Sequence, residues 1–345
     1  MPASVQSYKH HIPGSYGESN RRIRVTARTG DISNTQAGQY FLGVQVYPTR
    51  KITAIVTIVI IVLKKNMESS PLELKTLQGK PASILGLGGN LNLEASCISM
   101  AYEAGINYYF FDDYHFCDDM LFHSLLEGLR MLISVNREQI IIAVGSVYRS
   151  HNKLRDYLDQ VRKRLNVDMI DVFLVGYVSP TDDMKEIQGI FDELHNWKEG
   201  GSIRYAGVST HNRSLALELL NSGQCDVLMH RYNMAHRGAE EKVLPTAYQA
   251  GIPVVSFTST RWGSLLKGHS HWQGKIPNAA DCYRYVLQNP AVSLALISPK
   301  NNTELQENMS VFNSPTLTNE EIKYWEEYGK IIYGNGQNSF ETKWL

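Results

Sequence analysis

The chain has 345 residues, of which 43% are hydrophobic and 20% are charged. A chain of this length and composition buries a large core, so it suits one large globular domain with an appendage, or two ordinary domains. Its 34 basic residues equal its 34 acidic residues, and this balance gives no reason to expect a nucleic-acid partner. The four cysteines, at positions 97, 117, 225 and 282, lack the spacing of a zinc site or of a secreted disulfide scaffold. We therefore expect a cytoplasmic protein with no metal site.

The first 66 residues differ from the rest in charge and in periodicity. They carry nine Lys or Arg against only Glu18 and Asp31, which leaves 25 basic and 32 acidic residues in the remainder. An uninterrupted apolar run of twelve residues, 52–63, lies near the end of this segment. The run is shorter than the roughly 17 to 25 residues of a membrane span, and it lies too far along the chain for an ordinary signal peptide. We expect residues 1–66 to form a leader outside the core, with a membrane-surface anchor as the alternative.

From residue 81 onward, short apolar runs alternate with segments of helical periodicity in eight successive pairs. Continuous apolar runs of this kind are typical of a parallel sheet that is buried on both faces. Eight such units close most economically into a (β/α)8 TIM barrel, which we expect over residues 67–331, followed by a C-terminal tail over 332–345. The alternative is an open, doubly wound sheet, but the GLGG at 86–89 lacks the GxGxxG arrangement of a dinucleotide-binding turn. The expected strands are 83–89, 106–111, 139–145, 169–177, 203–209, 225–230, 253–257 and 292–298, and the expected helices are 92–105, 119–133, 150–166, 182–201, 213–223, 238–251, 278–289 and 302–312.

In such a barrel, functional side chains lie at the carboxyl ends of the strands. Any one of them taken alone is more often a turn former or a helix cap than a catalytic group. The segments selected by this rule are 112–117, 145–149, 176–177, 209–211, 230–233, 258–262 and 298–300.

Three long stretches carry a resemblance to a known family. They are "FDELHNWKEGGSIRYAGVSTHN" at 191–212, "HRYNMAHRGAEEKVLPTAYQAGIPVVSF" at 230–257 and "LQENMSVFNSPTLTNEEI" at 305–322. They resemble signatures of the aldo-keto reductases, and the resemblance extends over about residues 82–329 in the right order. It implies a (β/α)8 barrel that binds NADPH at its carboxyl face without a Rossmann motif and reduces a small-molecule carbonyl compound.

The family's chemistry uses a tyrosine as general acid, with an aspartate and a lysine that tune its pKa and a histidine that orients the substrate. The aspartate and the tyrosine normally lie five residues apart after the second strand. Taking Asp112 as the aspartate puts Cys117 at the tyrosine position, whereas keeping the spacing from the preceding "GIN" selects Phe110 and His115. Neither alignment restores the pair.

The lysine and histidine positions are both occupied by glycine. Counting from Arg137 and Asp171, which match family landmarks, places Gly145 at the lysine and Gly176 at the histidine. Because general acid catalysis contributes roughly two to four orders of magnitude, we expect a degraded tetrad to slow ketone reduction severely.

A replacement proton donor is expected in the loop after the second strand. Tyr114 or His115 has the chemistry to donate the proton, and Asp112 or the following aspartate would raise its basicity. Tyr177 and His211 are expected nearby across the mouth of the barrel. The alternative is that 112–119 is a loop whose aspartates cap the next helix.

The cofactor signals of the family are partly retained. The resemblance aligns Ser209 with the serine beneath the nicotinamide and Thr210 with the neighbouring asparagine, which holds the carboxamide. It aligns Glu307 and Asn308 with the pair that contacts adenine.

Lys300 is placed to meet a ribose phosphate, but Glu304 would oppose one. The cofactor implied by the resemblance is NADPH, with NADH as the alternative. The four basic residues between 230 and 237 are either a cationic site for an acidic ligand or a capped, solvated turn.

Two classes of function are consistent with this sequence. The first is an NADPH-dependent carbonyl reductase with a non-standard catalytic site. The second is a catalytically silent relative that binds nucleotide and works as a sensor or scaffold, and analogy of fold does not choose between them.

Overall fold

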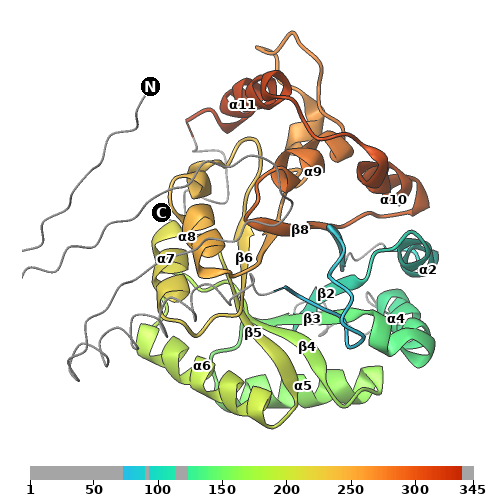
Figure 1. The fold of residues 1–345 in the computed structure, drawn as a ribbon, viewed down its shortest axis with the longest axis vertical. Helices are drawn as coiled ribbons and strands as arrows, with labels where there is room; N and C mark the ends of the chain where they lie inside the picture. The colour runs from blue at the N-terminus through green and yellow to red at the C-terminus, as the bar shows by residue number, and fades with distance from the viewer. Residues whose placement is uncertain (1–72, 90–92, 114–122, 336–345) are drawn as a thin grey trace, which may run out of the picture. The chain divides into compact units, whose positions relative to one another are not determined.

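The computed structural model describes residues 73–89, 93–113 and 123–335. Within them, eight parallel strands follow one another in chain order and close into a barrel, with the helices outside it (Figure 1). The predicted (β/α)8 barrel is therefore confirmed. The predictions for the leader, for Tyr114, His115 and Cys117, and for residues 336–345 lie outside the described residues. The strands are β1 (Leu85–Gly88), β2 (Tyr108–Asp112), β3 (Ile141–Ser146), β4 (Ile170–Val175), β5 (Ile203–Thr210), β6 (Val227–Arg231), β7 (Val254–Phe257) and β8 (Val292–Ile297).

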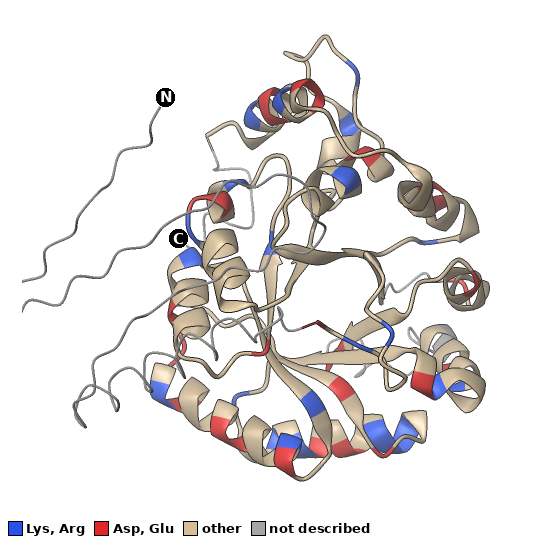
Figure 2. Ribbon diagram, in the orientation of Figure 1, with Lys and Arg blue, Asp and Glu red and all other residues tan. Residues whose placement is uncertain are grey.

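Each strand is followed by a helix, as the alternating pattern predicted. These are α2 (Ser96–Glu103), α4 (His123–Asn136), α5 (His151–Leu165), α6 (Met184–Glu199), α7 (Arg213–Asn221), α8 (Val243–Ala250), α9 (Ala279–Leu287) and α10 (Asn302–Met309). Short 3-10 turns are η1 (Arg137–Gln139), η2 (Gly238–Glu240), η3 (Ser264–Lys267) and η4 (Ser310–Asn313). Charged residues lie mainly on the helices (Figure 2).

A further helix, α11 (Asn319–Tyr333), follows the barrel and was not predicted. It begins at a capping box in which the Thr318 hydroxyl accepts from the Glu321 N–H at 3.2 Å and the Glu321 carboxylate accepts from the Thr318 N–H at 2.7 Å. The T-x-x-E spacing is present in the sequence, so the signal for this helix was available. The helix extends two residues into the segment that was expected to be a tail.

The apolar side chains form two layers, one between the strands and the helices and one inside the barrel. Along β2, Tyr108 and Phe110 belong to the inner layer, whereas Tyr109 and Phe111 pack toward the helices. This alternation follows from the two-residue period of a strand. It places Asp112, the next inward residue, at the carboxyl end of the barrel interior.

At the opposite end of the barrel, a buried carboxylate joins three strands. Asp171 is fully buried and accepts from Arg137 Nη1 and Arg204 Nη1 at 2.8 Å each, and from the Ile142 N–H at 2.9 Å. Two guanidinium groups compensate the cost of burying this charge.

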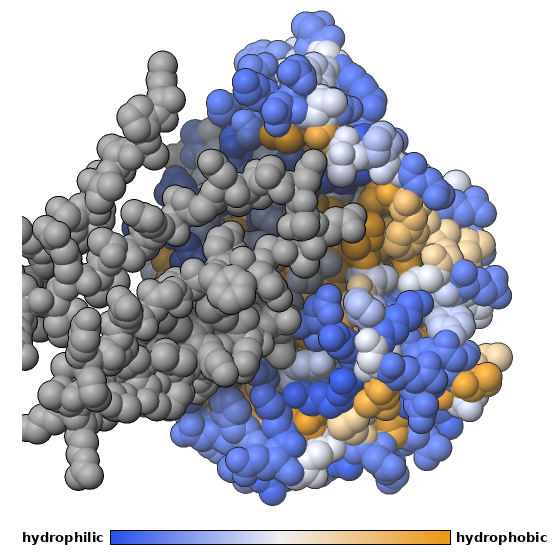
Figure 3. Space-filling view, viewed as in Figure 1, coloured by the Kyte–Doolittle hydropathy of each residue, from blue (hydrophilic) through white to orange (hydrophobic). Residues whose placement is uncertain are grey.

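The visible face in Figure 3 is mainly hydrophilic, with smaller apolar areas on the side of α2 and α4. On α4, Met131 is 73% exposed and Val135 is 78% exposed. In the part of the chain that the structure describes, no helix combines the length and the apolar character needed to cross a membrane.

Candidate active site

Side chains that face the barrel interior are apolar along most of the strands, and on β2, β5 and β6 the last inward residue is polar. Asp112 ends β2 and is the registered partner of Gly145 on β3. Ser209 lies opposite Met229 near the end of β5, and Arg231 ends β6 two residues after the inward-facing Met229. Because the strands are parallel, these ends meet at one mouth.

Gly145, at the position counted for the lysine, lies next to Asp112. A Cβ added at Gly145 would lie 3.5 Å from Cβ of Asp112 and 3.3 Å from Cζ of Phe110. The tip of the Phe110 ring therefore borders the place where a longer side chain would begin. The position is adjacent to the carboxylate, as the family pattern requires of its lysine.

Gly176, at the histidine position, is much more constrained. Its N–H donates to the carbonyl oxygen of Ser146 at 2.7 Å, and an added Cβ would lie 3.0 Å from that oxygen and 3.2 Å from its carbon. A Cβ is rarely this close to backbone atoms, so a side chain here would force the ends of β3 and β4 apart. The glycine at this position is part of the local backbone packing.

Asp113 has a structural role. It is 3% exposed, and its Oδ2 accepts from the Ser146 hydroxyl at 2.7 Å and from the Val147 N–H at 2.8 Å. Its Oδ1 has no hydrogen-bond partner in the described part of the chain. The carboxylate ties the end of β2 to the end of β3, and Asp112 is the aspartate that faces the mouth.

An aromatic group fills another part of the mouth. The rings of Tyr177 and His211 are stacked, with centroids 5.7 Å apart and an interplanar angle of 18°. Phe257 meets His211 edge-on at 4.9 Å, and Arg231 Nη1 lies 2.9 Å from His211 Nδ1. The expectation that Tyr177 and His211 lie close together is confirmed.

Arg149 braces the loop that carries Tyr177. Its guanidinium contacts both carboxylate oxygens of Asp182, at 2.9 and 3.1 Å, and donates to the carbonyl oxygen of Gly176 at 2.9 Å. Burial acts to raise the pKa of Asp182, but hydrogen bonds from Arg149 and from the backbone of Ser179 outweigh it, so the pKa is lowered. The Asp182 carboxylate is thus ionised at neutral pH and holds the loop.

The basic residues at 230–237 do not form one cationic cluster. His230 is 1% exposed, its Nδ1 lies 2.7 Å from the carbonyl oxygen of Thr210, and burial lowers its pKa to about 4. It is therefore neutral at physiological pH. Arg237 pairs with Glu240 at 2.8 Å. Of this group, Arg231 is the cation at the mouth.

Two predicted cofactor residues lie side by side on β5 and differ in orientation. Ser209 is on the inward side and is 5% exposed. Thr210 is fully buried, and its hydroxyl donates to the carbonyl oxygen of Val178 at 2.6 Å and accepts from the Asn212 N–H at 3.1 Å. The Thr210 side chain is therefore engaged in the barrel wall.

The remaining predicted cofactor residues lie together at β8 and α10. Lys300 is exposed, and its backbone N–H donates to the Glu304 carboxylate at 2.8 Å. Glu307 Oε1 accepts from the Ala279 N–H at 3.2 Å, which links α10 to the start of α9, and Asn308 is 4% exposed. The Glu304 carboxylate thus accepts the hydrogen bond of the Lys300 N–H, in the loop where a cofactor phosphate was expected.

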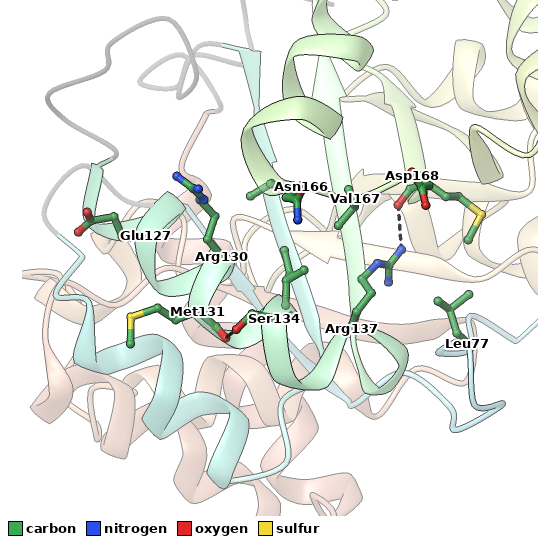
Figure 4. Close-up of a pocket in the computed structure, with 12 residues that line it drawn as sticks. Leu77, Glu127, Arg130, Met131, Ser134, Arg137, Asn166, Val167 and Asp168 are labelled. Atoms are coloured by element: carbon green, nitrogen blue, oxygen red, sulfur yellow. Dashed lines mark hydrogen bonds between the residues drawn. The ribbon is translucent and has the colours of Figure 1, made fainter.

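A cavity of about 850 Å³ lies away from this mouth, beside α4 and the segment that leads into β4 (Figure 4). Its lining includes Leu77, Met131, Asp168 and Arg137, and Arg137 Nη2 donates to the carbonyl oxygen of Met169 at 2.9 Å. These residues precede β3 and β4, so the cavity is at the amino end of the barrel. That end of a TIM barrel contributes to stability and seldom to catalysis.

Sequence reasoning missed two features of the mouth. The pairing of Arg231 with His211 was detectable in part, because Val227, Met229 and Arg231 follow the inward alternation of β6. The brace formed by Arg149 left no comparable signal, because it depends on how two loops pack.

The model of the aldo/keto reductase family matches residues 92–281. Aldo-keto reductase YhdN of Bacillus subtilis (strain 168) is 28% identical over 146 residues, which are 38% of this chain and 40% of that protein. The NADH-specific methylglyoxal reductase of Escherichia coli (strain K12) is 25% identical over 116 residues, 34% of this chain and 36% of that one. The uncharacterized oxidoreductase YqkF of Bacillus subtilis is 23% identical over 286 residues, 71% of this chain and 90% of that one.

The chain thus aligns with less than half the length of the first two relatives and with most of the third. Among solved structures, aldo-keto reductase AKR11C1 of Bacillus halodurans in its holo form superposes with a TM-score of 0.60 at 18% identity, covering 74% of this chain and 95% of that one. Its apo form gives a TM-score of 0.56 at 20% identity, with coverage of 72% and 92%. At these identities the structural likeness shows the fold.

Proposed function

This chain belongs to the aldo/keto reductase family, whose model matches residues 92–281, and on this premise we propose that it is an oxidoreductase that reduces a carbonyl compound with NADPH. Members of the family use nicotinamide cofactors and act on small-molecule carbonyl substrates. The observation that carries the proposal is that β2, β5 and β6 end in the polar inward residues Asp112, Ser209 and Arg231, all at the carboxyl end of the barrel.

The mouth has groups that suit a nicotinamide dinucleotide. Ser209 is on the inward side of β5, and the exposed Lys300, two residues before α10, offers a cation to a phosphate. We propose Ser209, Lys300, Glu307 and Asn308 as cofactor contacts, with Thr210 contributing through its backbone. When bound, the nicotinamide supplies the hydride. Because Glu304 opposes a ribose phosphate, NADH is the second cofactor to test.

The residues of the chain must stabilise the negative charge that develops on the carbonyl oxygen and supply a proton to it. We propose that Asp112 at the end of β2 and Tyr114 or His115, which follow it in the chain, perform the proton transfer. Asp112 lies where a carboxylate sets the basicity of a neighbouring donor. The non-standard composition of this site is part of the proposal.

Fluorescence titration of the purified full-length protein with NADPH and with NADH tests cofactor binding, and a panel of aldehydes, ketones and quinones then tests turnover. We expect binding and slow carbonyl reduction that falls further in Tyr114→Phe or His115→Gln. Absence of nucleotide binding would refute the proposal.

A second candidate function is a nucleotide-binding sensor or scaffold without catalysis. It is favoured by the glycines at 145 and 176, the positions where the family pattern is expected to place the lysine and the histidine. Tight nucleotide binding with no turnover of any carbonyl in the panel would support this alternative over the reductase.

A further inference from the structure

The residue next to the missing histidine is an aromatic hydrogen-bond donor in an unusual backbone conformation. Tyr177 directly follows Gly176 and has a φ of 51°, which is a left-handed value that a bulky side chain rarely adopts. Val172 and Leu174 face the interior, so regular alternation would turn residue 177 outward. The left-handed turn instead directs the Tyr177 ring against His211. Uncommon conformations of this kind persist where the surrounding structure holds them, and they cluster at functional sites.

The plane against which Tyr177 stacks is held from two sides. Phe257 contacts His211 edge-on, and Arg231 Nη1 lies 2.9 Å from Nδ1 of the same ring. A guanidinium has no acceptor, so Nδ1 of His211 accepts this hydrogen bond and the ring proton is on Nε2. The orientation and the tautomer of the imidazole are both fixed, and the tyrosine ring rests on a well-positioned surface.

The backbone that carries Tyr177 is held independently of the stack. Arg149 joins the carbonyl oxygen of Gly176 to the carboxylate of Asp182, and Asp182 Oδ2 also accepts from the Ser179 N–H at 2.7 Å. The chain is therefore anchored on both sides of Tyr177, at Gly176 and at Ser179. A side chain whose backbone and ring are both fixed has little conformational freedom left to lose when a substrate binds.

The Tyr177 side chain is partly exposed, and its hydroxyl remains protonated. The residue is 44% exposed, and the partial burial of its phenol, followed by the carboxylate of Asp112, raises its pKa above the usual value of 10.0. The phenol is thus a hydrogen-bond donor throughout the neutral range. Asp112, the second cause of this shift, ends β2 at the carboxyl end of the barrel.

We propose that Tyr177 takes the place of the absent histidine, with its hydroxyl donating a hydrogen bond to the carbonyl oxygen of the substrate. In this arrangement His211 and Arg231 are positioning residues, and the proton that neutralises the oxygen comes from a separate donor. The inference rests on the proposed function, because it assigns the group that orients and polarises the carbonyl at the same mouth.

The test is equilibrium binding of p-nitrobenzaldehyde to the full-length protein in the presence of NADP⁺, where the oxidised cofactor permits binding without turnover. Tyr177→Phe removes the hydroxyl and keeps the ring. Tyr248→Phe is the matched control, because Tyr248 is 56% exposed and lies on α8. We expect Tyr177→Phe to weaken aldehyde binding about 3- to 10-fold, the value of one neutral hydrogen bond. The affinity for NADP⁺ and the binding by Tyr248→Phe should be unchanged.

With NADPH, kcat of Tyr177→Phe should fall by about 10²- to 10³-fold, as when one donor to a developing oxyanion is lost. Equal aldehyde affinity in Tyr177→Phe and the unmodified protein would overturn the inference, as would a lack of aldehyde binding by the unmodified protein. If the unmodified protein binds the aldehyde through Tyr177 and yet never reduces it, the proposed function fails while the inference stands.

The positioning role of Arg231 has its own readout. Arg231→Met removes the donor to His211 and should reproduce part of the loss in aldehyde affinity, whereas Arg231→Lys keeps a cationic donor and should recover much of it. If both variants bind the aldehyde as the unmodified protein does, Arg231 has no positioning role.

Discussion

The two glycines at the mouth should respond differently to the addition of a single methyl group. In Gly176→Ala, the new Cβ would lie 3.0 Å from the carbonyl oxygen of Ser146, which is backbone held by a 2.7 Å hydrogen bond. The strands must shift, and overpacking of this kind costs about 1 to 3 kcal/mol. In Gly145→Ala, the nearest atoms belong to the tip of the Phe110 side chain at 3.3 and 3.4 Å. A small ring movement relieves this contact, and the reduced freedom of the unfolded chain contributes about 0.4 to 1 kcal/mol of stability.

We expect Gly176→Ala to be clearly destabilised and Gly145→Ala to remain close to the unmodified protein. Urea unfolding followed by tryptophan fluorescence measures both. With a denaturant slope of about 3 kcal/mol/M, the midpoint of Gly176→Ala should fall by about 0.3 to 1 M. Equal midpoints for the two variants, or a larger loss in Gly145→Ala, would refute the contrast between a glycine packed against backbone and one packed against a movable side chain.

Three further variants test other contacts of the mouth. Asp113→Ala leaves a buried hydroxyl and a backbone N–H without their acceptor, so the free energy of unfolding should fall by about 1 to 3 kcal/mol in the same urea experiment; an unchanged midpoint would contradict the tether. The lowered pKa of Asp182 means that its ion pair with Arg149 stabilises the fold above the ordinary value of 3.8, and this contribution is lost as the pH falls through the folded-state pKa. Arg149→Met should therefore be less stable than the unmodified protein at neutral pH, and it should lose less stability on acidification below about pH 4. If the free energy of unfolding of the two proteins falls in parallel with pH, the Arg149–Asp182 pair does not stabilise the loop. Glu304→Gln removes a carboxylate from the loop that would hold a ribose phosphate and should raise the affinity for NADPH relative to NADH by up to about fivefold in a fluorescence titration; an unchanged ratio would place the phosphate elsewhere.

The barrel was predictable because its signal is repeated along the chain. Residues 140–145, for example, are apolar at every position, since β3 is buried on both faces, and the run is followed by a helix with one apolar face. Boundaries were less accurate. The expected helix 238–251 is divided into η2 and α8, and Pro245, which lacks an N–H and fixes its own φ, lies in the first turn of α8.

The position of the candidate site could be predicted, but its arrangement could not. Parallel topology alone brings Asp112, Gly145 and Ser209 to one end, so the carboxyl-end rule located the mouth. The fate of individual side chains depends on packing and backbone conformation that have no local signal. Thr210 turns its hydroxyl into the wall, and Tyr177 reaches the mouth through a left-handed backbone.

The basic segment at 230–237 shows the same limit. Four cations close together in sequence suggest a site for an anion, yet burial makes His230 neutral and an ion pair engages Arg237. The burial and pairing of each side chain in the fold distinguish His230 and Arg237 from Arg231. Of these, the sequence could predict only that Arg231 points inward, from the alternation of β6.

The most direct test of a carbonyl reductase is transfer of the hydride itself. The full-length protein is incubated with p-nitrobenzaldehyde and NADPH that carries deuterium at the hydride-donating carbon, and the alcohol is analysed by mass spectrometry. We predict an alcohol that contains one deuterium from the cofactor, formed slowly and dependent on the protein. An alcohol fraction no greater than that of the protein-free control, with nucleotide bound, would contradict the reductase and leave a binding protein.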